Sequence, residues 1–470
     1  MMRLLVSLII AAVAVIRGAE AVAADSKPAN VVLVVADDLG WTDLGCYGSD
    51  FYESPQIDAL ARDGMRFTAN YSACTVCSPT RAALLTGKYP ARLHITDWIP
   101  GQPPANPKLI VPNFTKHLPH EEITLAEHLH NAGYATASIG KWHLGGPEFY
   151  PQHHGFDVNI AGTDQPQPRP SYFAPYAIET IEQGPEGEYI TDRLGEEAVK
   201  FIRAHGDRPF FLYLPHFAVH TPIQAKKELI DRHRSRRKPG MRHTNAAYAG
   251  MIDSMDQTVG RIRETLAELG IADRTIIIFT SDNGGRIPTT SNVPLRAGKG
   301  SCYEGGVRVP LIVFWPGATS PGSTCDTPVI TMDLFPTILE MLGRTLDADA
   351  ICDGVSLVPL LRQTGTLAER ALFWHYPHYQ HYQMEGTTPY GAIRRGEYKL
   401  IEFYDDFRAE LYNVHHDIGE QKNLADSEPE RVKSLREELH AWRNAVDAQM
   451  PAPNPNHDPT KPEDTRNFRR

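Results

Sequence analysis

The segment that decides the fold reads NVVLVVADD, from Asn30 to Asp38. A continuous apolar run rich in β-branched residues is typical of a strand that is buried on both faces, as in a parallel sheet. Asp37 and Asp38 follow at the carboxyl end of this strand, which is where open α/β sheets place their ligands. The segment therefore predicts an α/β fold with a polar site at the carboxyl edge of its sheet.

Strands and helices alternate along most of the chain around this segment. Apolar runs with the length of strands lie at 134–139, 209–214, 275–280 and 310–315. Helical patterns lie among them at 55–64, 123–132, 190–204 and 245–269. This alternation predicts an α/β domain with a large, mainly parallel sheet flanked by helices. The strand at 275–280 ends in a second polar sequence, Ser281-Asp282-Asn283-Gly284.

The pattern changes after about residue 366. Short strands with exposed faces are expected at 391–404 and 409–414, and an amphipathic helix at 429–446. These elements predict a smaller C-terminal α+β subdomain that contains an antiparallel sheet. We expect the chain to divide into segments 1–23, 25–365 and 366–450, followed by an irregular tail at 451–470.

The N-terminus is typical of a secretory signal peptide. Arg3 precedes an apolar run from Leu4 to Ile16, and small residues follow up to Ala23 and Ala24. The alternative is a membrane anchor, but the run is shorter than a spanning helix needs. We therefore expect cleavage near Ala23 or Ala24 and an exported protein, periplasmic or secreted, that is not stably inserted in a membrane.

Charge and cysteine content exclude two classes of protein. The chain of 470 residues has 47 Lys and Arg against 57 Asp and Glu, a formal net charge of −10. A general electrostatic affinity for nucleic acid is therefore not expected, and any anion must be bound by local positive charge. Six cysteines are too few for a disulfide scaffold. A bridge between Cys325 and Cys352 is one candidate pairing.

The most informative segment begins at Cys77. Ser78-Pro79 predicts the start of a helix that ends at Gly87. Cys77 then lies at a helix N-terminus, where backbone N–H groups and the helix dipole favour an anion. Arg81 follows one turn later and can point to the same place. Two simpler interpretations are a redox or disulfide pair with Cys74, and a buried, inert cysteine.

The stretch from Cys77 to Gly87 resembles the signature of the type I sulfatases, the formylglycine-dependent, arylsulfatase-like family within the alkaline phosphatase-like superfamily. It reads Cys-x-Pro-Thr-Arg followed by Leu-Thr-Gly. The resemblance extends over nearly the whole chain after the signal peptide. It implies a sulfatase fold with residues 25–365 as the catalytic domain, and the hydrolysis of sulfate esters. It also implies that a formylglycine-generating enzyme oxidises Cys77 to formylglycine (3-oxoalanine).

The resemblance also implies a metal site. The pairs Asp37-Asp38 and Asp282-Asn283 could each be a turn at the end of a strand. Together they offer hard oxygen ligands at two strand ends. Such ligands suit Ca²⁺, or Mg²⁺ as the alternative, better than zinc. The family implies one cation per chain, held by Asp37, Asp38, Asp282, Asn283 and the modified Cys77.

Further motifs resemble the parts of the family that bind sulfate. Gly140-Lys-Trp-His-Leu-Gly145 matches a family motif, as do the His-x-Pro sequence at His220 and the segment from Lys299 to Arg308. A sulfate ester repels nucleophiles, so its site needs concentrated positive charge. The implied catalytic residues are Cys77, Arg81, Lys141, His143, His220 and Lys299. The leaving alcohol would take its proton from His220 or Lys299, and His143 would deprotonate the second hydroxyl of the hydrate. We expect His216 and Arg308 to be structural.

Other segments are candidates for the substrate-binding walls. The segments are 94–99, 153–154, 164–166, the aromatic and histidine-rich run 373–379, and the basic run 232–238. Packing at the subdomain interface is the alternative for the aromatic run, and a solvated surface is the alternative for the basic run. The whole chain is similar to bacterial glycan sulfatases, so we expect a sulfated saccharide, with a galacto-configured sugar sulfated at O4 or O6 as the first candidate.

Two other functions are compatible with these motifs. The superfamily includes phosphonate and phosphate ester hydrolases, some of which carry the same signature. A glycan-binding protein with an unconverted Cys77 is the other alternative, although a binding module has no need of that cysteine.

Overall fold

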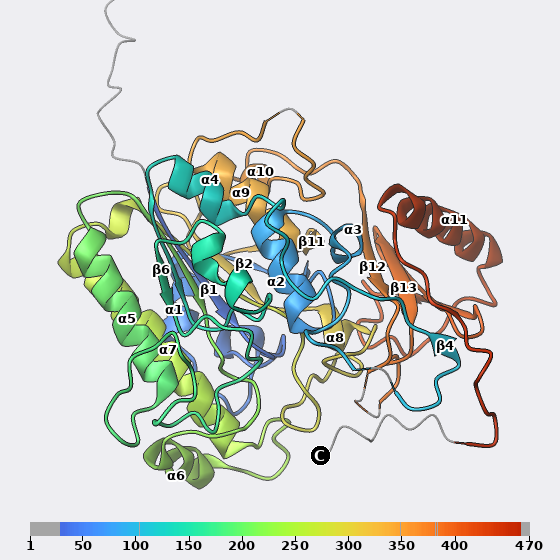
Figure 1. The fold of residues 1–470 in the computed structure, drawn as a ribbon, viewed down its shortest axis with the longest axis horizontal. Helices are drawn as coiled ribbons and strands as arrows, with labels where there is room; N and C mark the ends of the chain where they lie inside the picture. Colours follow the sequence, from blue (N-terminus) through green and yellow to red (C-terminus); the bar gives the residue numbers. More distant parts are fainter. Residues whose placement is uncertain (1–28, 103, 348, 381, 383, 462–470) are drawn as a thin grey trace, which may run out of the picture.

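The structure is a computed structural model that describes residues 29–102, 104–347, 349–380, 382 and 384–461. The described residues form a central sheet of eight strands with the spatial order β10-β2-β9-β8-β1-β7-β5-β6 (Figure 1). Its strands are β1 (Asn30–Ala36), β2 (Met65–Phe67), β5 (Ala135–Ile139), β6 (Val158–Ile160), β7 (Phe210–Pro215), β8 (Thr275–Ser281), β9 (Leu311–Phe314) and β10 (Ser323–Cys325). The predicted signal peptide, residues 1–23, lies outside the described residues.

Parallel pairing dominates the sheet, as predicted. β1 pairs in parallel with β7 on one side and with β8 on the other, and β5 continues the parallel part to β6. Only towards the other edge does the direction alternate, since β9 is antiparallel to both β8 and β2. Ala36 lies opposite Ser281 in the ladder between β1 and β8. The pairs Asp37-Asp38 and Asp282-Asn283 therefore leave neighbouring strands at the same carboxyl edge.

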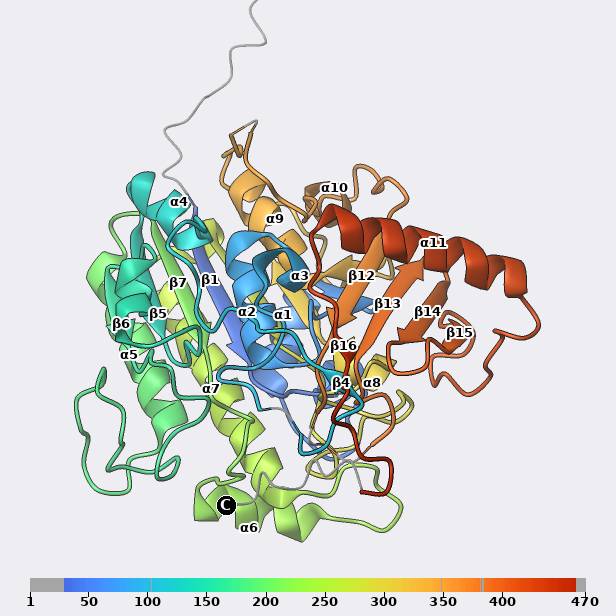
Figure 2. The same cartoon turned by 45° about the vertical axis from the view of Figure 1, so that its right-hand side comes forward.

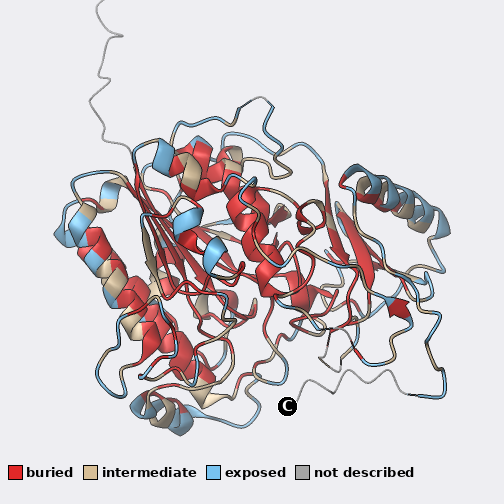
Figure 3. Ribbon diagram, in the orientation of Figure 1, coloured by how far each residue is buried: buried red, intermediate tan, exposed pale blue. Residues whose placement is uncertain are grey.

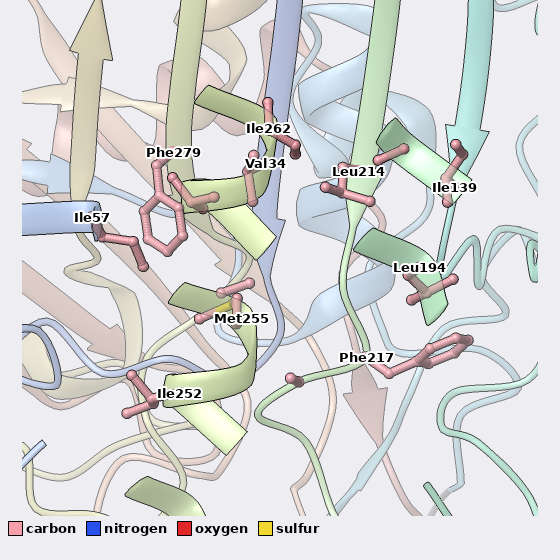
Figure 4. Packing of buried hydrophobic residues seen from close by; sticks show 14 of the residues in the cluster. Val34, Ile57, Ile139, Leu194, Leu214, Phe217, Ile252, Met255, Ile262 and Phe279 are labelled. Carbon is pink, nitrogen blue, oxygen red and sulfur yellow. The ribbon is translucent and has the colours of Figure 1, made fainter. Parts of the chain in front are cut away.

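Helices cover both faces of this sheet, which explains why β1 is apolar throughout. Alternate residues of β1 enter two separate buried clusters, with Val34 in one and Leu33 in the other. The first face packs against α1 (Pro55–Asp63), α5 (Ile190–His205) and α7 (Ala246–Glu268), and the second against α2 (Cys77–Thr86), α4 (Leu125–Asn131) and α9 (Leu334–Met341). Figure 4 shows the first cluster, with Val34 and Phe279 beside Met255 of α7.

Local sequence signals set the ends of the helices. Pro55 occupies the first turn of α1, where its missing N–H has no intrahelical partner to lose. Thr124 caps α4 and forms a capping box with Glu127. α2 ends at Gly87, whose φ of 71° is a left-handed conformation that favours glycine. The predicted boundaries of these helices agree with the structure to within about two residues.

A second sheet of four antiparallel strands forms the smaller C-terminal part, as predicted (Figure 2). Its strands, in spatial order, are β12 (Ala371–Tyr376), β13 (Tyr390–Arg395), β14 (Tyr398–Phe403) and β15 (Ala409–Asn413). The expected exposed faces at 391–404 are wrong, because almost all of β13 and β14 is buried (Figure 3). α11 (Pro429–Ala445) covers one face, where Ile393 meets Leu439, and the main domain covers the other, where Trp374 meets Tyr71.

The remaining elements are short. They are α3 (Pro90–Leu93), α6 (Lys227–Arg236), α8 (Glu304–Val307), α10 (Val358–Leu361), and two small pairs, β3 (Asn70–Tyr71) with β11 (Val329–Ile330) and β4 (Leu109–Ile110) with β16 (Ala452–Pro453). β16 lies in the tail that was expected to be irregular, so the start of that tail is ordered by pairing. Within the described residues, no helix has the length and apolar character needed to cross a membrane.

All six cysteines lie in the described part of the chain, and none of them forms a disulfide. The bridge considered between Cys325 and Cys352 is therefore absent, as is a bond between Cys74 and Cys77. Burial raises the pKa of the Cys74 thiol to about 12, so Cys74 stays protonated at neutral pH. This property does not suit a redox pair, which needs a reactive thiolate.

Candidate active site

Cys77 is the first residue of α2 and lines a cavity of about 210 Å³. The cavity lies at the carboxyl edge of the large sheet, where the loops after β1, β5, β7 and β8 converge with the start of α2. Its lining residues are Val76, Cys77, Trp98, Gln102, His143, Pro166, Gln167, His220, Thr221, Arg286, Lys299, Gln380 and Tyr382. Polar side chains, including His143 and Lys299, therefore line the cavity together with Cys77, and the aromatic side chains of Trp98 and Tyr382 form part of its walls.

His143 directs an unprotonated nitrogen at Cys77. Its Nε2 lies 2.6 Å from the carbonyl oxygen of Ile99, which can only accept, so Nε2 carries the hydrogen. Nδ1 of the neutral ring is then an acceptor, 3.3 Å from Cys77 Sγ and 3.2 Å from Ser78 Oγ. Burial and the charge of Lys141 hold the pKa of His143 well below its ordinary value, so the ring is neutral at pH 7. His143 can therefore accept a proton from a group at position 77.

The carboxylates at the two strand ends are paired with buried cations. Lys141 Nζ lies 2.6 Å from Asp37 Oδ2, and Lys299 Nζ lies 2.5 Å from Asp38 Oδ1. Arg81 donates through Nε to Asp282 Oδ2 at 2.9 Å. The sequence predicted these residues separately, and the fold brings them together within one buried group.

Three oxygens of the predicted metal ligands have no hydrogen-bond partner among the residues that the structure describes. They are Asp37 Oδ1, Asp38 Oδ2 and Asn283 Oδ1, all buried. Leaving such oxygens unpaired is unfavourable in a protein interior, whereas a hard divalent cation is bound by oxygens of this kind. Asp37, Asp38 and His220 also each offer a ligand atom within 4.8 Å of the others. The residues present therefore fit a Ca²⁺ or Mg²⁺ ion.

Asp37 and Asp38 differ in the direction in which their surroundings shift the pKa. Burial and the neighbouring carboxylate of Asp282 raise the pKa of Asp37 well above its ordinary value. Burial acts in the same direction on Asp38, but the charge of Lys299 outweighs it and lowers the pKa of Asp38. A cation beside Asp37 would favour its ionised form and relieve the repulsion between the carboxylates.

His220 lies on the opposite side of Asp38 from Asn283. Its Nδ1 is 2.8 Å from the carbonyl oxygen of Thr221, so Nδ1 carries the hydrogen and Nε2 is the acceptor. Nε2 lies 3.8 Å from Asp38 Oδ2 and the ring lines the cavity. Burial and the charge of Lys299 hold the pKa of His220 well below its ordinary value.

The backbone takes unusual conformations at this site. Asp38 and His143 have φ values of 62° and 58°, in the left-handed region that non-glycine residues seldom adopt. Gly140 has a φ of 129°, and a Cβ there would lie 2.0 Å from the carbonyl oxygen of Pro215. Only glycine permits this approach between the chain after β5 and the end of β7, and it places Lys141 beside Asp37. Such conformations gather at functional sites.

The predicted catalytic residues fall into two layers. Cys77, His143, His220 and Lys299 line the cavity. Arg81 and Lys141 are fully buried behind it, against Asp282 and Asp37. Of the two residues expected to be structural, His216 is buried and is not among the described lining residues, and Arg308 donates to the carbonyl of Thr68 and pairs with Glu304.

The predicted walls agree with the structure only in part. Trp98 and Pro166 line the cavity, but His153 and His154 are not among its described lining residues. In the aromatic run 373–379, His378 and Tyr379 line a separate cavity, and the rest packs at the subdomain interface. The basic run 232–238 lies on and after α6, away from the cavity, where Arg232 and Arg236 pair with Glu53.

The sequence analysis missed several lining residues. They are Val76, Gln102, Gln167, Thr221, Arg286, Gln380 and Tyr382. Arg286 had a usable signal, because it follows Asp282-Asn283-Gly284-Gly285 at a strand end that was already assigned to the site. Gln380 and Tyr382 follow the aromatic run, but no local pattern distinguishes a loop residue that lines a cavity from one that faces solvent.

Comparisons with known proteins agree with this geometry. The sulfatase family model matches residues 29–344, and a model of the C-terminal region of N-sulphoglucosamine sulphohydrolase matches residues 298–446. A sulfatase of Formosa agariphila is 34% identical, and the match covers 89% of each chain. Human arylsulfatase A is also 34% identical, with 90% of this chain and 89% of the relative covered.

Solved structures support the same assignment. The crystal structure of Ps i-CgsB has a TM-score of 0.76 and 30% sequence identity, and the match covers 92% of this chain and 96% of that chain. A second structure of the same protein, in complex with k-i-k-neocarrahexaose, has a TM-score of 0.75. The family model covers most of the chain and a sulfatase relative is 34% identical over 89% of it, so this protein belongs to the sulfatase family and is a sulfuric ester hydrolase.

Proposed function

We propose that the enzyme removes sulfate from a sulfated saccharide, and that its nucleophile is Cys77 after oxidation to formylglycine. The observation that carries the proposal is the position of Cys77 at the N-terminus of α2, with the acceptor nitrogen of His143 3.3 Å from its sulfur. Lys299 lines the same cavity and supplies positive charge. In its oxidised and hydrated form, residue 77 supplies two geminal hydroxyl groups, one as nucleophile and one that can be deprotonated to release sulfate.

The proposal includes one divalent cation. Asp37, Asp38, Asp282 and Asn283 would hold it, since three of these side chains have buried oxygens without a partner. Ca²⁺ is the first candidate and Mg²⁺ the second. The ion would neutralise charge on the sulfate and on the nucleophile.

The surrounding residues have distinct parts in the proposed reaction. His143 Nδ1 accepts the proton of the second hydroxyl at position 77, and the Ile99 carbonyl stabilises the resulting imidazolium through Nε2. Burial lowers the pKa of Lys299 but the charge of Asp38 outweighs it, so the amine stays charged and can hold a proton near the leaving oxygen. His220 presents Nε2 as an acceptor on the same side.

A saccharide substrate is supported by the walls of the cavity and by one relative. Trp98 and Tyr382 offer aromatic faces, and Gln102, Gln167 and Gln380 offer amides that can bind hydroxyl groups. The similar protein Ps i-CgsB has been solved with a bound carrahexaose. A galacto-configured sugar with sulfate at O4 or O6 is the first candidate. We also propose export after cleavage near Ala23 or Ala24, which N-terminal sequencing of the native protein tests.

The first experiment compares nitrophenyl sulfate with nitrophenyl phosphate. Protein produced together with a formylglycine-generating enzyme is expected to hydrolyse the sulfate ester much faster, and mass spectrometry of the Cys77 peptide is expected to show the aldehyde or its hydrate. A faster reaction with phosphate would favour the phosphatase alternative. An unmodified thiol in an active preparation would falsify the nucleophile assignment, and glycan binding without hydrolysis by converted protein would favour the binding alternative.

The second experiment identifies the proton donor. The variant His220→Ala is compared with the parent on nitrophenyl sulfate, which has a good leaving group, and on a sulfated sugar, which has a poor one. A donor role for His220 predicts the larger loss on the sugar, because only the poor leaving group needs the proton. An equal loss on both esters would assign the donor role to Lys299.

A further inference from the structure

Arg286 is a cation of the cavity wall that the proposed reaction does not use. It lies in the loop after β8, three residues beyond Asn283. The preceding carbonyl, that of Gly285, accepts hydrogen bonds from the backbone N–H of Lys299 at 3.0 Å and from Asn292 Nδ2 at 2.8 Å. These bonds fix the backbone beside Arg286 to the segment that carries Lys299, so the two cations are held in a defined relation.

The guanidinium of Arg286 has no polar partner among the described residues. No carboxylate of that part of the chain lies within ion-pair distance, and no acceptor takes a hydrogen bond from it. Its recorded contact is the face of the Tyr382 ring, 5.7 Å from the ring centroid. Lys299, the other ammonium or guanidinium group of the lining, is paired with Asp38 at 2.5 Å. Arg286 is therefore the cation that remains available to a ligand.

The chemistry of this group limits what it can bind. A guanidinium presents N–H donors in a planar fork that matches the oxygens of a sulfate or a carboxylate, and such charge-assisted pairs are stronger than bonds to a neutral hydroxyl. In the proposed reaction Lys299 already serves the ester that is cleaved. A second anion on the substrate is the partner that would complete the site at Arg286.

Gln380 shows that this wall is built for a polar ligand. Its Nε2 donates to the hydroxyl of Tyr376 and lies 3.3 Å from Asp97 Oδ1, which fixes the orientation of the amide. Its Oε1 is buried and has no hydrogen-bond partner among the described residues. Both Gln380 and Arg286 line the cavity, so the wall that carries the cation also carries a buried acceptor without a partner among the described residues.

We propose that Arg286 is a specificity-determining residue that binds a second anionic substituent of the saccharide, either a sulfate ester or a carboxylate. The inference rests on the proposed function and extends it. The preferred substrate then carries at least two anionic groups, one that is cleaved and one that is bound.

The test measures kcat/KM for sulfate release from four substrates. They are nitrophenyl sulfate, a monosulfated sugar, the same sugar with a second sulfate, and the monosulfated sugar joined to a uronate. The variants are Arg286→Gln, Arg286→Lys and the control Arg237→Gln, which removes an equal charge from an exposed arginine outside the cavity. Binding of the same sugars is measured by calorimetry with Cys77→Ala and with the double variant Cys77→Ala/Arg286→Gln, in which no hydrolysis is needed.

Arg286→Gln is expected to lower kcat/KM for a doubly anionic sugar by about 10- to 100-fold, mostly through KM, and to leave the two singly charged substrates nearly unchanged. Arg286→Lys should retain part of the preference, because an ammonium keeps the charge but not the fork. A loss confined to the disulfated or to the uronate substrate supports the proposal and identifies the anion.

Two results would overturn the inference: an equal loss on all four substrates, or no loss on either doubly anionic sugar. If the parent enzyme hydrolyses none of the esters, the proposed function fails instead. The calorimetric series still decides the role of Arg286 in that case, since it reads affinity for the second anion without turnover.

Discussion

The molecule contains two buried clusters of charge, and they differ in how completely they are paired. The site cluster lies at the carboxyl edge of the large sheet and consists of Asp37, Asp38, Asp282, Asn283, Arg81, Lys141 and Lys299. The interface cluster lies between the large domain and the small sheet and consists of Tyr71, Glu304, Arg308, Lys399 and Glu420. Both are built from carboxylates and cations that are almost fully excluded from water.

In the interface cluster every carboxylate oxygen has a partner. Lys399 Nζ lies 3.1 Å from Glu304 Oε1 and 3.0 Å from Glu420 Oε1. Tyr71 donates to Glu304 Oε2 at 2.7 Å, and the backbone N–H of Glu304 donates to Glu420 Oε2 at 2.7 Å. The site cluster instead leaves an oxygen open on Asp37, Asp38 and Asn283. Complete pairing suits a structural role, and open oxygens suit a site that binds something from outside.

The largest effect is expected from replacing Cys77, the proposed nucleophile beside the site cluster. Cys77→Ala should lower sulfate ester hydrolysis by a factor on the order of 10⁴ or more, because the nucleophile is lost. Thermal unfolding should change little. Cys74→Ala is the matched control, a buried cysteine three residues earlier in the chain, and it should keep most of the activity. Equal inactivation of both variants would revive the interpretation of a functional cysteine pair.

Removing the central cation of the interface cluster should produce the opposite pattern. Lys399→Met leaves Glu304 and Glu420 facing each other in the interior, so the free energy of unfolding should fall by about 3–5 kcal/mol. Activity per folded molecule should persist below the unfolding temperature. Lys227→Met removes an exposed pair with Asp231 and should leave the free energy of unfolding nearly unchanged. A stable but inactive Lys399→Met protein would contradict the structural role, and urea unfolding with nitrophenyl sulfate assays measures both properties.

Divalent ions should affect only the site cluster. Chelation should lower activity and stability together, and Ca²⁺ at about 100 times its dissociation constant should restore about 2.7 kcal/mol of stability. Asp282→Asn should weaken this response, because it alters a predicted ligand. The melting temperature of Lys399→Met should start lower than that of the parent, but Ca²⁺ should raise both by the same amount. Thermal melting against Ca²⁺ concentration checks this, and a response that depends on Lys399 would contradict it.

The contrast also explains which features could be predicted from sequence. The run 30–36 has the apolar pattern of a buried parallel strand, and the rule for carboxyl ends of parallel strands places Asp37 and Asp282 at the same edge of the sheet. That their strands are neighbours became known only from the structure. The helix signals at Ser78-Pro79 and Gly87 are local, and they predicted the position of Cys77 at a helix N-terminus. Its assignment as the nucleophile came from the resemblance of residues 77–87 to the sulfatase signature, not from the helix signals.

Features that depend on contacts between distant segments could not be predicted in this way. The strands at 391–404 have polar residues that suggested exposed faces, but α11 and the main domain bury them. Glu304 and Lys399 pair across 95 positions of sequence. Arg286 lines the cavity because its loop is bonded to Lys299, which no periodicity signals. Side chains with long-range partners therefore had to be found in the structure.

The smallest expected effect concerns the pH dependence of the interface cluster. Burial raises the pKa of Glu420 from 4.5 to about 7, and the charge of Lys399 only partly opposes this, because the lysine is shared with Glu304. Lys399 and Arg308 outweigh burial at Glu304 and lower its pKa to about 2, so Glu304 stays ionised between pH 5 and 8. In this window the folded protein binds more protons at Glu420 than the unfolded chain does, and stability falls as pH rises towards 7.

Glu420→Gln should remove this part of the pH dependence, because an amide does not titrate. Between pH 5 and 7, the slope of the free energy of unfolding against pH should become flatter by at most about 1.4 kcal/mol per pH unit. The amide has one acceptor oxygen where the carboxylate has two, so it cannot accept from both the Glu304 backbone N–H and Lys399, and the variant will also lose stability at every pH. The slope of the difference between parent and variant, measured by urea unfolding from pH 5 to 8, separates titration from this constant loss. A difference that does not vary with pH would mean that Glu420 is ionised throughout, and the interface cluster would then be insensitive to pH in this range.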